Sequence, residues 1–326
     1  MSKMTMEQFR EFYRADLLPR LEQLEGQRKQ VAARVTQVGI ICAVIVVALV
    51  GGGLAMRLHP AILIIAGILV VGIFFWRYTV LYGKYLAEFK GSIIRQIVSF
   101  VDPGLSYERT GCISEGEYMG SRIFLKEPDR YRGEDLVFGT IGKTEMRFSE
   151  VHSEYKTTTT DSKGRRQTHW HTIFKGIFFV ADFNKHFNGL TVVLPDVAEN
   201  LLGRLGQMFQ SWNIAREGDL VRLEDPVFEK RFVVYSTDQI EARYLLSTAL
   251  MSRIVEYMDR TGCQVYLSFA RSSIHVAIPY WRDLFEPRLF KTVLDPQLAE
   301  GYLRDLLLVT SIIDELDLNT RIWTKA

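Results

Sequence analysis

Two uncharged runs near the start of the chain constrain its fold more than any other feature. Residues 35–56 include no charged side chain, and neither do residues 58–76. A run of about 18 or more apolar residues spans the roughly 30 Å hydrocarbon core of a bilayer as a helix. Because only Arg57 separates the runs, we predict a helical hairpin that crosses a membrane twice, with its turn at residues 57–60. The alternative is a hairpin buried in a soluble core, where apolar helices are usually shorter.

The positive charges that flank the runs indicate the orientation of the hairpin. Basic residues gather on the side of the two chain termini, whereas the turn between the runs carries only Arg57. They are Arg20, Arg28, Lys29 and Arg34 before the first run, and Arg77, Lys84, Lys90 and Arg95 after the second. Because positive residues stay on the cytoplasmic side, we predict a two-pass protein of the inner (plasma) membrane with both termini in the cytoplasm.

Four segments are predicted around this anchor. Residues 1–34 place apolar side chains at helical spacing, which predicts an amphipathic cytoplasmic helix with a bend or break at Pro19. Residues 35–82 form the transmembrane hairpin. Residues 83–102 continue its second helix as a juxtamembrane stalk, because the apolar stripe persists there at helical spacing. The remaining residues, 103–326, form a cytoplasmic domain.

Alternation of apolar and polar residues dominates the first half of the cytoplasmic domain. After an irregular segment, the alternation predicts an antiparallel meander of about four strands. These strands are residues 136–139, 144–160, 168–183 and 190–194. The pair Asn188-Gly189 is a strong signal for a tight turn before the last strand. Residues 156–169 are polar and predict a mobile hairpin tip.

Helical periodicity returns in the second half of this domain. The predicted helices are residues 196–212, 247–260 and 296–316, and the predicted strands are residues 221–223, 232–235, 264–269 and 273–279, the last two as a hairpin. Ser236 followed three residues later by Gln239 predicts a capped helix start, and Gly262 predicts a helix end. The fold class is therefore α+β: a two-helix transmembrane hairpin, a helical stalk, and a cytoplasmic domain of antiparallel sheet plus helices.

Two histidines are the first candidates for chemistry. His169 and His171 lie two apart on a predicted strand, so their rings point to the same face. Two imidazoles on one face can share a zinc ion, with His152 or a carboxylate such as Asp182 as a third ligand. The alternative is that both are polar residues of an exposed hairpin, and no carboxylate spacing places a general base beside them. We expect no resident cofactor.

Charged side chains supply two further candidates. Asp238 and Glu241 lie three apart at a predicted helix start, where they either perform acid–base chemistry or complement the positive helix end. Lys163, Arg165 and Arg166 at the hairpin tip are candidates for contact with anionic headgroups or an acidic partner. The net charge of +2 offers no argument for nucleic-acid binding, and the chain lacks the phosphate-binding glycine motifs.

Three blocks of sequence show a resemblance to a known family. They are FKG, FNKHF and TVVLP within residues 174–195, FEK and VYSTDQIEARY within residues 228–244, and VAIPY and DLFEP within residues 276–287. Together these blocks resemble an uncharacterised bacterial membrane-protein family, known as a domain of unknown function. The resemblance implies a pair of N-terminal spans and a cytoplasmic α+β domain. It implies no reaction, cofactor or catalytic residue.

These observations favour a non-enzymatic function. We expect a membrane-tethered interaction or scaffold module that faces the cytoplasm, because no motif brings a nucleophile, a base and metal ligands together. Its expected partners are the lipid bilayer and an unidentified protein, and the sequence predicts no oligomeric state. One alternative is a zinc-dependent hydrolase that uses His169 and His171. Another is a domain that binds anionic lipid through its basic hairpin.

Overall fold

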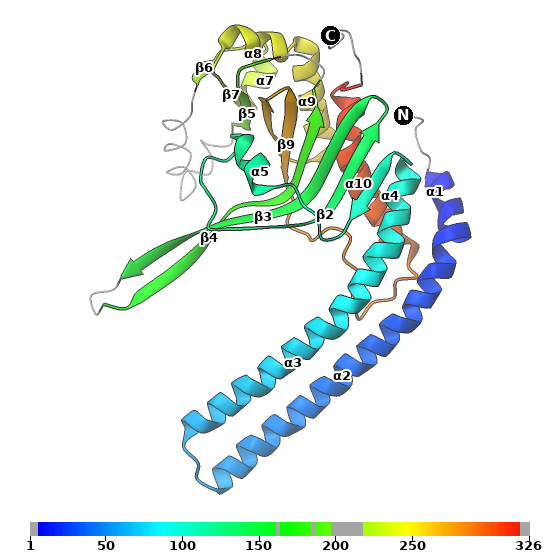
Figure 1. The fold of residues 1–326 in the computed structure, drawn as a ribbon, viewed down its shortest axis with the longest axis vertical. Coiled ribbons are helices and arrows are strands. Elements are labelled where there is room, and N and C mark those ends of the chain that lie inside the picture. Colours follow the sequence, from blue (N-terminus) through cyan, green and yellow to red (C-terminus); the bar gives the residue numbers. More distant parts are fainter. Residues whose placement is uncertain (1–5, 161–163, 184–186, 197–217, 320–326) are drawn as a thin grey trace. The chain divides into compact units, whose positions relative to one another are not determined.

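The computed structural model describes residues 6–160, 164–183, 187–196 and 218–319 (Figure 1). The chain divides into two compact units. The helical unit comprises Lys3–Ile97 together with Phe285–Tyr302, and the sheet unit comprises Val98–Leu284 together with Leu303–Ala326.

The helical unit is built on two long helices that lie side by side (Figure 1). Helix α1 (Met6–Phe12) passes through a π-helical turn, η1 (Tyr13–Leu17), into α2 (Leu18–Ala55), which contains the first uncharged run. Helix α3 (Pro60–Phe89) contains the second. The predicted helical hairpin and its turn are therefore confirmed. The predicted disturbance at Pro19 takes the form of the π-helical turn just before it, because proline supplies no N–H to the ladder.

Small residues and a cap shape the turn of the hairpin. A Cβ atom on Gly53 would collide with the side chain of Leu63, so glycine allows α2 and α3 to approach closely there. Pro60 occupies the first turn of α3, where its missing N–H is not needed. The Nδ1 atom of His59 accepts a hydrogen bond from the Ala61 N–H at 3.3 Å. The turn is therefore specified by local chemistry.

Among the described residues, the apolar parts of both helices are almost entirely exposed. Each helix is long and apolar enough to cross a membrane, and in their most apolar 18-residue windows only 6% and 0% of the residues are buried. A hairpin in the core of a soluble protein would be mostly buried. After α3 the helix continues through a second π-helical turn, η2 (Lys90–Ile94), and α4 (Arg95–Val101). The predicted helical continuation beyond the second run is therefore present.

The sheet unit contains a nine-stranded sheet among its described residues, and every pair of neighbours is antiparallel. The strands are β1 (Leu105–Glu108), β2 (Arg130–Ile141), β3 (Thr144–Thr160), β4 (Arg166–Asp182), β5 (Thr191–Pro195), β6 (Asp219–Val221), β7 (Phe232–Ser236), β8 (Tyr266–Ala270) and β9 (Ser273–Pro279). Their order is β1-β2-β3-β4-β9-β8-β5-β7-β6. The predicted α+β class is confirmed.

One part of the predicted meander is wrong. Strands β2, β3 and β4 do pair in sequence, but β5 pairs with β7 and β8 while the next neighbour of β4 is β9. The β8–β9 hairpin lies between β4 and β5 because the end of β4, with Phe178, Phe179 and Val180, is buried and needs a partner strand on each side. The N–H groups of Asn188 and Gly189 donate to the carboxylate of Glu241 rather than closing a two-residue hairpin.

The helices of the sheet unit begin and end at recognisable caps. They are α5 (Glu115–Gly120), α7 (Pro226–Glu229), α8 (Gln239–Leu245), α9 (Thr248–Thr261) and α10 (Pro296–Glu315), whose first residues belong to the helical unit. Helix α9 ends at Gly262, with φ of 67°, as predicted. The predicted cap at Ser236 is wrong, because Ser236 ends β7 and Asp238 caps α8 instead. The predicted helix 196–212 lies almost entirely outside the described residues.

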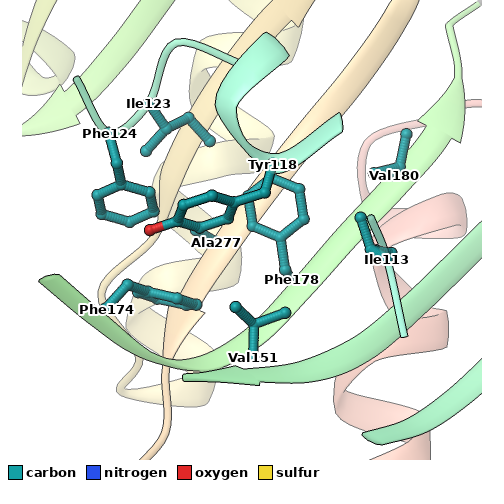
Figure 2. Close-up of a cluster of buried hydrophobic side chains, with 9 residues drawn as sticks. All are labelled: Ile113, Tyr118, Ile123, Phe124, Val151, Phe174, Phe178, Val180 and Ala277. Atoms are coloured by element: carbon teal, nitrogen blue, oxygen red, sulfur yellow. The ribbon is translucent and has the colours of Figure 1, made fainter. Parts of the chain in front are cut away.

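An aromatic core lies under α5 on one face of the sheet (Figure 2). Tyr118 of α5 is fully buried and stacks on Phe124, with 5.2 Å between the ring centroids. Its ring also contacts Phe178 of β4 at 5.2 Å, and its hydroxyl is hydrogen-bonded to the Ser153 hydroxyl at 2.8 Å. The opposite face is covered by α9 and by the part of α10 within this unit, which meet where the Tyr257 hydroxyl donates to the Leu308 carbonyl (Figure 1).

Candidate functional site

A β-bulge in β2 creates the most unusual chemistry of the sheet unit. The register pairs Glu134 with Glu150 and then shifts, so that Val137 next pairs with Phe148. Within the bulge, Asp135 has a φ of 60°, a conformation uncommon for residues other than glycine. Its N–H donates to the Arg109 carbonyl at 2.9 Å, which holds the bulge in place. Bulges of this kind often re-aim side chains beside functional sites.

The bulge brings three carboxylates together. Ligand oxygens of Glu134, Asp135 and Glu150 all lie within 4.8 Å of one another, and they are the one such group of three potential metal ligands found among the described residues. Asp135 is fully buried, and its Oδ1 accepts a hydrogen bond from the Tyr107 hydroxyl at 2.5 Å. Burial, followed by the charge of Asp135, raises the pKa of Tyr107. The phenol therefore remains a neutral donor to this carboxylate.

The environment of Glu150 raises the pKa of its carboxyl group. Only 7% of the residue is exposed. Burial, with smaller contributions from the negative charges of Asp283, Glu134 and Asp135, raises the pKa of Glu150 to about 7. The Leu284 N–H opposes this by donating to Glu150 Oε2 at 2.8 Å. Glu150 is thus a carboxyl group that changes charge near neutral pH.

A pocket of about 420 Å³ opens beside these acids. Its walls also carry cations, including Arg109, Arg132 and Lys175, together with His152. The Lys175 ammonium forms an ion pair with Asp283 at 2.9 Å, and the hydrogen bond from this pair raises the pKa of Lys175. Carboxylate oxygens are the ligands that Mg²⁺ and Ca²⁺ prefer, and a carboxyl group with a pKa near 7 suits proton transfer. Both chemistries are therefore available to this pocket.

The sequence carries one signal for this site. Glu150 follows Phe148 by two residues on an alternating strand, so its side chain belongs to the same buried face. A carboxylate on a buried face needs an explanation, because charged residues are seldom buried unpaired. The Glu134–Asp135 pair could not be linked to it from the sequence, because the bulge sets the register between the strands.

His169 and His171 lie near the exposed end of β4. His171 stacks on Tyr155 with 4.9 Å between the ring centroids, and its Nε2 is hydrogen-bonded to the Thr157 hydroxyl at 2.8 Å. His152 pairs in register with Lys175, and Asp182 lies at the opposite end of β4. Among the residues that the structure describes, no group of three potential ligands within 4.8 Å includes these histidines. Metal binding by His169 and His171 stays a prediction.

The remaining predicted site residues separate into two groups. Arg165 and Arg166 are exposed near the start of β4, and Lys163 lies outside the described residues. Asp238 Oδ1 accepts the N–H groups of Ile240 and Glu241, so it caps a helix. Glu241 accepts backbone N–H groups at 2.8 and 2.7 Å, which gives it a structural contact as well.

A second unusual polar site lies in the helical unit. We call residues 285–295 the strap, because this segment crosses the base of the hairpin and is tied to both of its helices. Lys90, which is fully buried, forms an ion pair with Glu286 at 3.0 Å. The Tyr82 hydroxyl donates to the Pro287 carbonyl at 2.6 Å.

Charged side chains of α2 also form hydrogen bonds with the backbone of the strap. Arg28 Nη1 donates to the Leu289 carbonyl at 2.6 Å, and Glu25 Oε2 accepts the Val293 N–H at 3.1 Å. Arg28 and Glu25 are themselves joined by two hydrogen bonds of 2.8 and 2.7 Å. The Tyr13 hydroxyl donates to the Leu294 carbonyl at 2.8 Å. Buried charges are thus used to fix a backbone segment across two helices.

Comparisons with known proteins give a match to one family over part of the chain and no activity. Residues 172–318, a little under half of the chain, match a family described as a protein of unknown function (DUF3137). The three sequence blocks that suggested a domain of unknown function all lie within this range. No curated protein matches the chain. A crystal structure of the mycobacterial trehalose monomycolate transport factor A, TtfA, matches with 12% identity and a TM-score of 0.34, over 66% of this chain and 94% of that one.

Proposed function

We propose that this chain is a two-pass protein of the inner membrane whose sheet unit acts in the cytoplasm as a non-enzymatic interaction or scaffold module. The observation that carries the proposal is the exposure of the hairpin. The most apolar windows of α2 and α3 are 6% and 0% buried. An exposed apolar surface of this extent marks a site that contacts a membrane or another protein. A helix suits a bilayer because it satisfies its backbone hydrogen bonds within one segment.

The charges around the hairpin support the orientation. The turn carries only Arg57, whereas several basic residues precede the first apolar run and several follow the second. Positive charge therefore gathers at the end of the hairpin opposite the turn. Reporter fusions at the two termini test this: we expect both to give a cytoplasmic signal. A periplasmic signal from either terminus would mean that one of the two helices does not cross the membrane.

The interaction role rests on the ribbon, which we define as residues 157–160 of β3 and 166–174 of β4. Strand β2 pairs with β3 as far as Glu154 and no further. Strand β9 pairs with β4 from Gly176 onward, so residues of β4 before Gly176 have no pairing with β9. Beyond these points the described residues of the two strands pair only with each other, so their outer edges offer backbone groups to a further strand. Trp170 is 41% exposed on the ribbon, and Arg130 stacks over its ring at 3.8 Å.

A photo-crosslinking residue in place of Trp170 tests this role. Trp281, which is 72% exposed and lies outside the ribbon, is the matched control position. We expect irradiation of native membranes to produce a discrete protein adduct from position 170 and none from position 281. Equal adducts from both positions, or none from either, would contradict a partner at the ribbon.

A further inference from the structure

We infer that the strap is a third membrane contact, in which Arg288, Phe290 and Lys291 bind the headgroup layer of an anionic bilayer beside the hairpin. This inference rests on the proposed insertion of α2 and α3, and it adds a binding surface that neither helix contains.

The height of the strap along the two helices carries the inference. The strap contact nearest the second apolar run is at Tyr82 of α3, six residues beyond the end of that run at Trp76. The strap contact nearest the first apolar run is at Arg28 of α2, seven residues before that run begins at Val35. At 1.5 Å per residue, these contacts lie about 9 and about 10 Å outside the apolar segments. Headgroups occupy roughly the first 5 to 8 Å outside the hydrocarbon core, so extended side chains on the strap reach them.

The strap presents two kinds of side chain. Phe285, Leu289 and Val293 are buried. Between them, Arg288 and Lys291 are exposed, and Phe290 is 67% exposed. The hydrogen bonds of Arg28 and Glu25 to the neighbouring backbone fix this alternation. The exposed side chains therefore belong to a segment whose backbone is hydrogen-bonded to α2 at Leu289 and Val293.

The chemistry of the exposed side chains matches an anionic lipid surface. Phenylalanine partitions into the boundary between headgroups and acyl chains, and lysine and arginine are attracted to anionic headgroups. Of the two acidic residues of the strap, Glu286 pairs with Lys90, whereas Asp295 is exposed at the far end of the segment, where it accepts the Gln297 N–H at 2.9 Å. The exposed side chains at positions 288, 290 and 291 are thus basic and aromatic, which favours a bilayer over an acidic protein at this height.

A fluorescent probe on the strap tests the inference in the full-length protein. The three native cysteines are replaced, an environment-sensitive fluorophore is attached through Phe290→Cys, and the protein is placed in bilayer nanodiscs. Lipids with a nitroxide on the headgroup then quench any probe that touches them. Ile240→Cys, at an apolar position that is 81% exposed in the sheet unit, is the matched control.

We expect quenching at position 290 to exceed that at position 240 several-fold. It should be stronger in discs that contain phosphatidylglycerol than in discs of phosphatidylcholine alone. The further changes Arg288→Gln and Lys291→Gln should remove this preference for anionic lipid. Lys291→Cys provides a second labelling position, and it should be quenched similarly to position 290.

Two outcomes would overturn the inference, and they are distinguishable. If alkaline carbonate extracts the protein from vesicles, the hairpin does not insert, and both the proposed function and this inference fail. If the protein resists extraction but the probes at positions 290 and 291 are quenched no more than the one at position 240, the strap does not touch lipid. In that case the inference fails while membrane insertion stands.

Discussion

The two units of this protein bury charge in opposite ways. In the helical unit, buried charges meet opposite charges: Lys90 meets Glu286, and Arg28 meets Glu25. In the sheet unit, the bulge of β2 gathers like charges around Glu150, whose pKa rises to about 7. Ion pairing and protonation are two of the means by which a low-dielectric interior tolerates a carboxylate. The first ties the strap to the helices, whereas the second makes the sheet unit sensitive to pH.

The largest expected effect comes from breaking the buried ion pair of the helical unit. Glu286→Ala leaves the Lys90 ammonium buried without this carboxylate, and it also removes an acceptor of the Tyr82 hydroxyl at 3.1 Å. Loss of one partner of a buried pair costs about 3 to 5 kcal/mol, and because Glu286 is 27% exposed we expect about 3 kcal/mol. Thermal unfolding in detergent micelles measures the loss.

The control for this experiment is Glu22→Ala, at an exposed carboxylate of α2, which should change stability by less than about 0.5 kcal/mol. The double variant Lys90→Met, Glu286→Ala should recover part of the loss, since it removes both charges. If Glu286→Ala behaves like the control, the pair does not secure the strap.

The second effect concerns protonation in the sheet unit. The pKa of Glu150 is about 7 in the folded state against an ordinary value of 4.5, so the folded state binds more protons between these values. The contribution of Glu150 to the free energy of unfolding is therefore greatest below about pH 4.5. It is lost as the pH rises from there through 7, which lowers the free energy of unfolding by up to about 3 kcal/mol. Unfolding measured at pH 5 and pH 8 reports this difference.

Glu150→Gln should flatten that dependence and make the protein more stable than wild type at pH 8. Glu145→Gln, on an exposed position of the same strand, is the matched control and should leave the dependence unchanged. A wild-type profile that Glu150→Gln does not alter would show that another group titrates.

A smaller effect distinguishes a charged acceptor from a neutral one. The Tyr107 hydroxyl donates to the buried carboxylate of Asp135, whereas the Tyr118 hydroxyl is hydrogen-bonded to the Ser153 hydroxyl. Hydrogen bonds to charged groups contribute about 1.5 to 3 kcal/mol and neutral ones about 0.5 to 1.5 kcal/mol. Tyr107→Phe should therefore destabilise the protein more than Tyr118→Phe in chemical unfolding. The reverse order would contradict a charge-assisted hydrogen bond between Tyr107 and Asp135.

The smallest effect is expected at the exposed histidines. The double variant His169→Ala, His171→Ala should cost less than about 0.5 kcal/mol, because both positions are exposed. We expect metal analysis of the purified wild-type protein to find no stoichiometric zinc. Zinc near one equivalent, lost in the double variant, would favour a zinc-dependent hydrolase over a scaffold.

The sequence predicted local structure better than it predicted neighbours. Residues 144–160 were predicted as a strand and match β3 residue for residue, and the β8–β9 hairpin was predicted nearly as closely. The Asn188-Gly189 signal misled, because the buried end of β4 pairs with β9 instead of β5. The local preference of Asn-Gly for a tight turn contributes less to stability than the burial of a central strand does. The prediction of a cap at Ser236 was wrong because Asp238, which immediately precedes α8, is the residue that caps it.

By itself the sequence determined the hairpin of apolar helices, the class of the fold and most strand boundaries. These depend on the length and period of apolar residues, which are local properties. Only the tertiary structure decided that Glu150 meets the bulge at Glu134 and Asp135, and that Phe285–Tyr302 joins the helical unit. Such contacts join residues far apart in the chain, so they depend on which surfaces bury each other once the whole chain has folded.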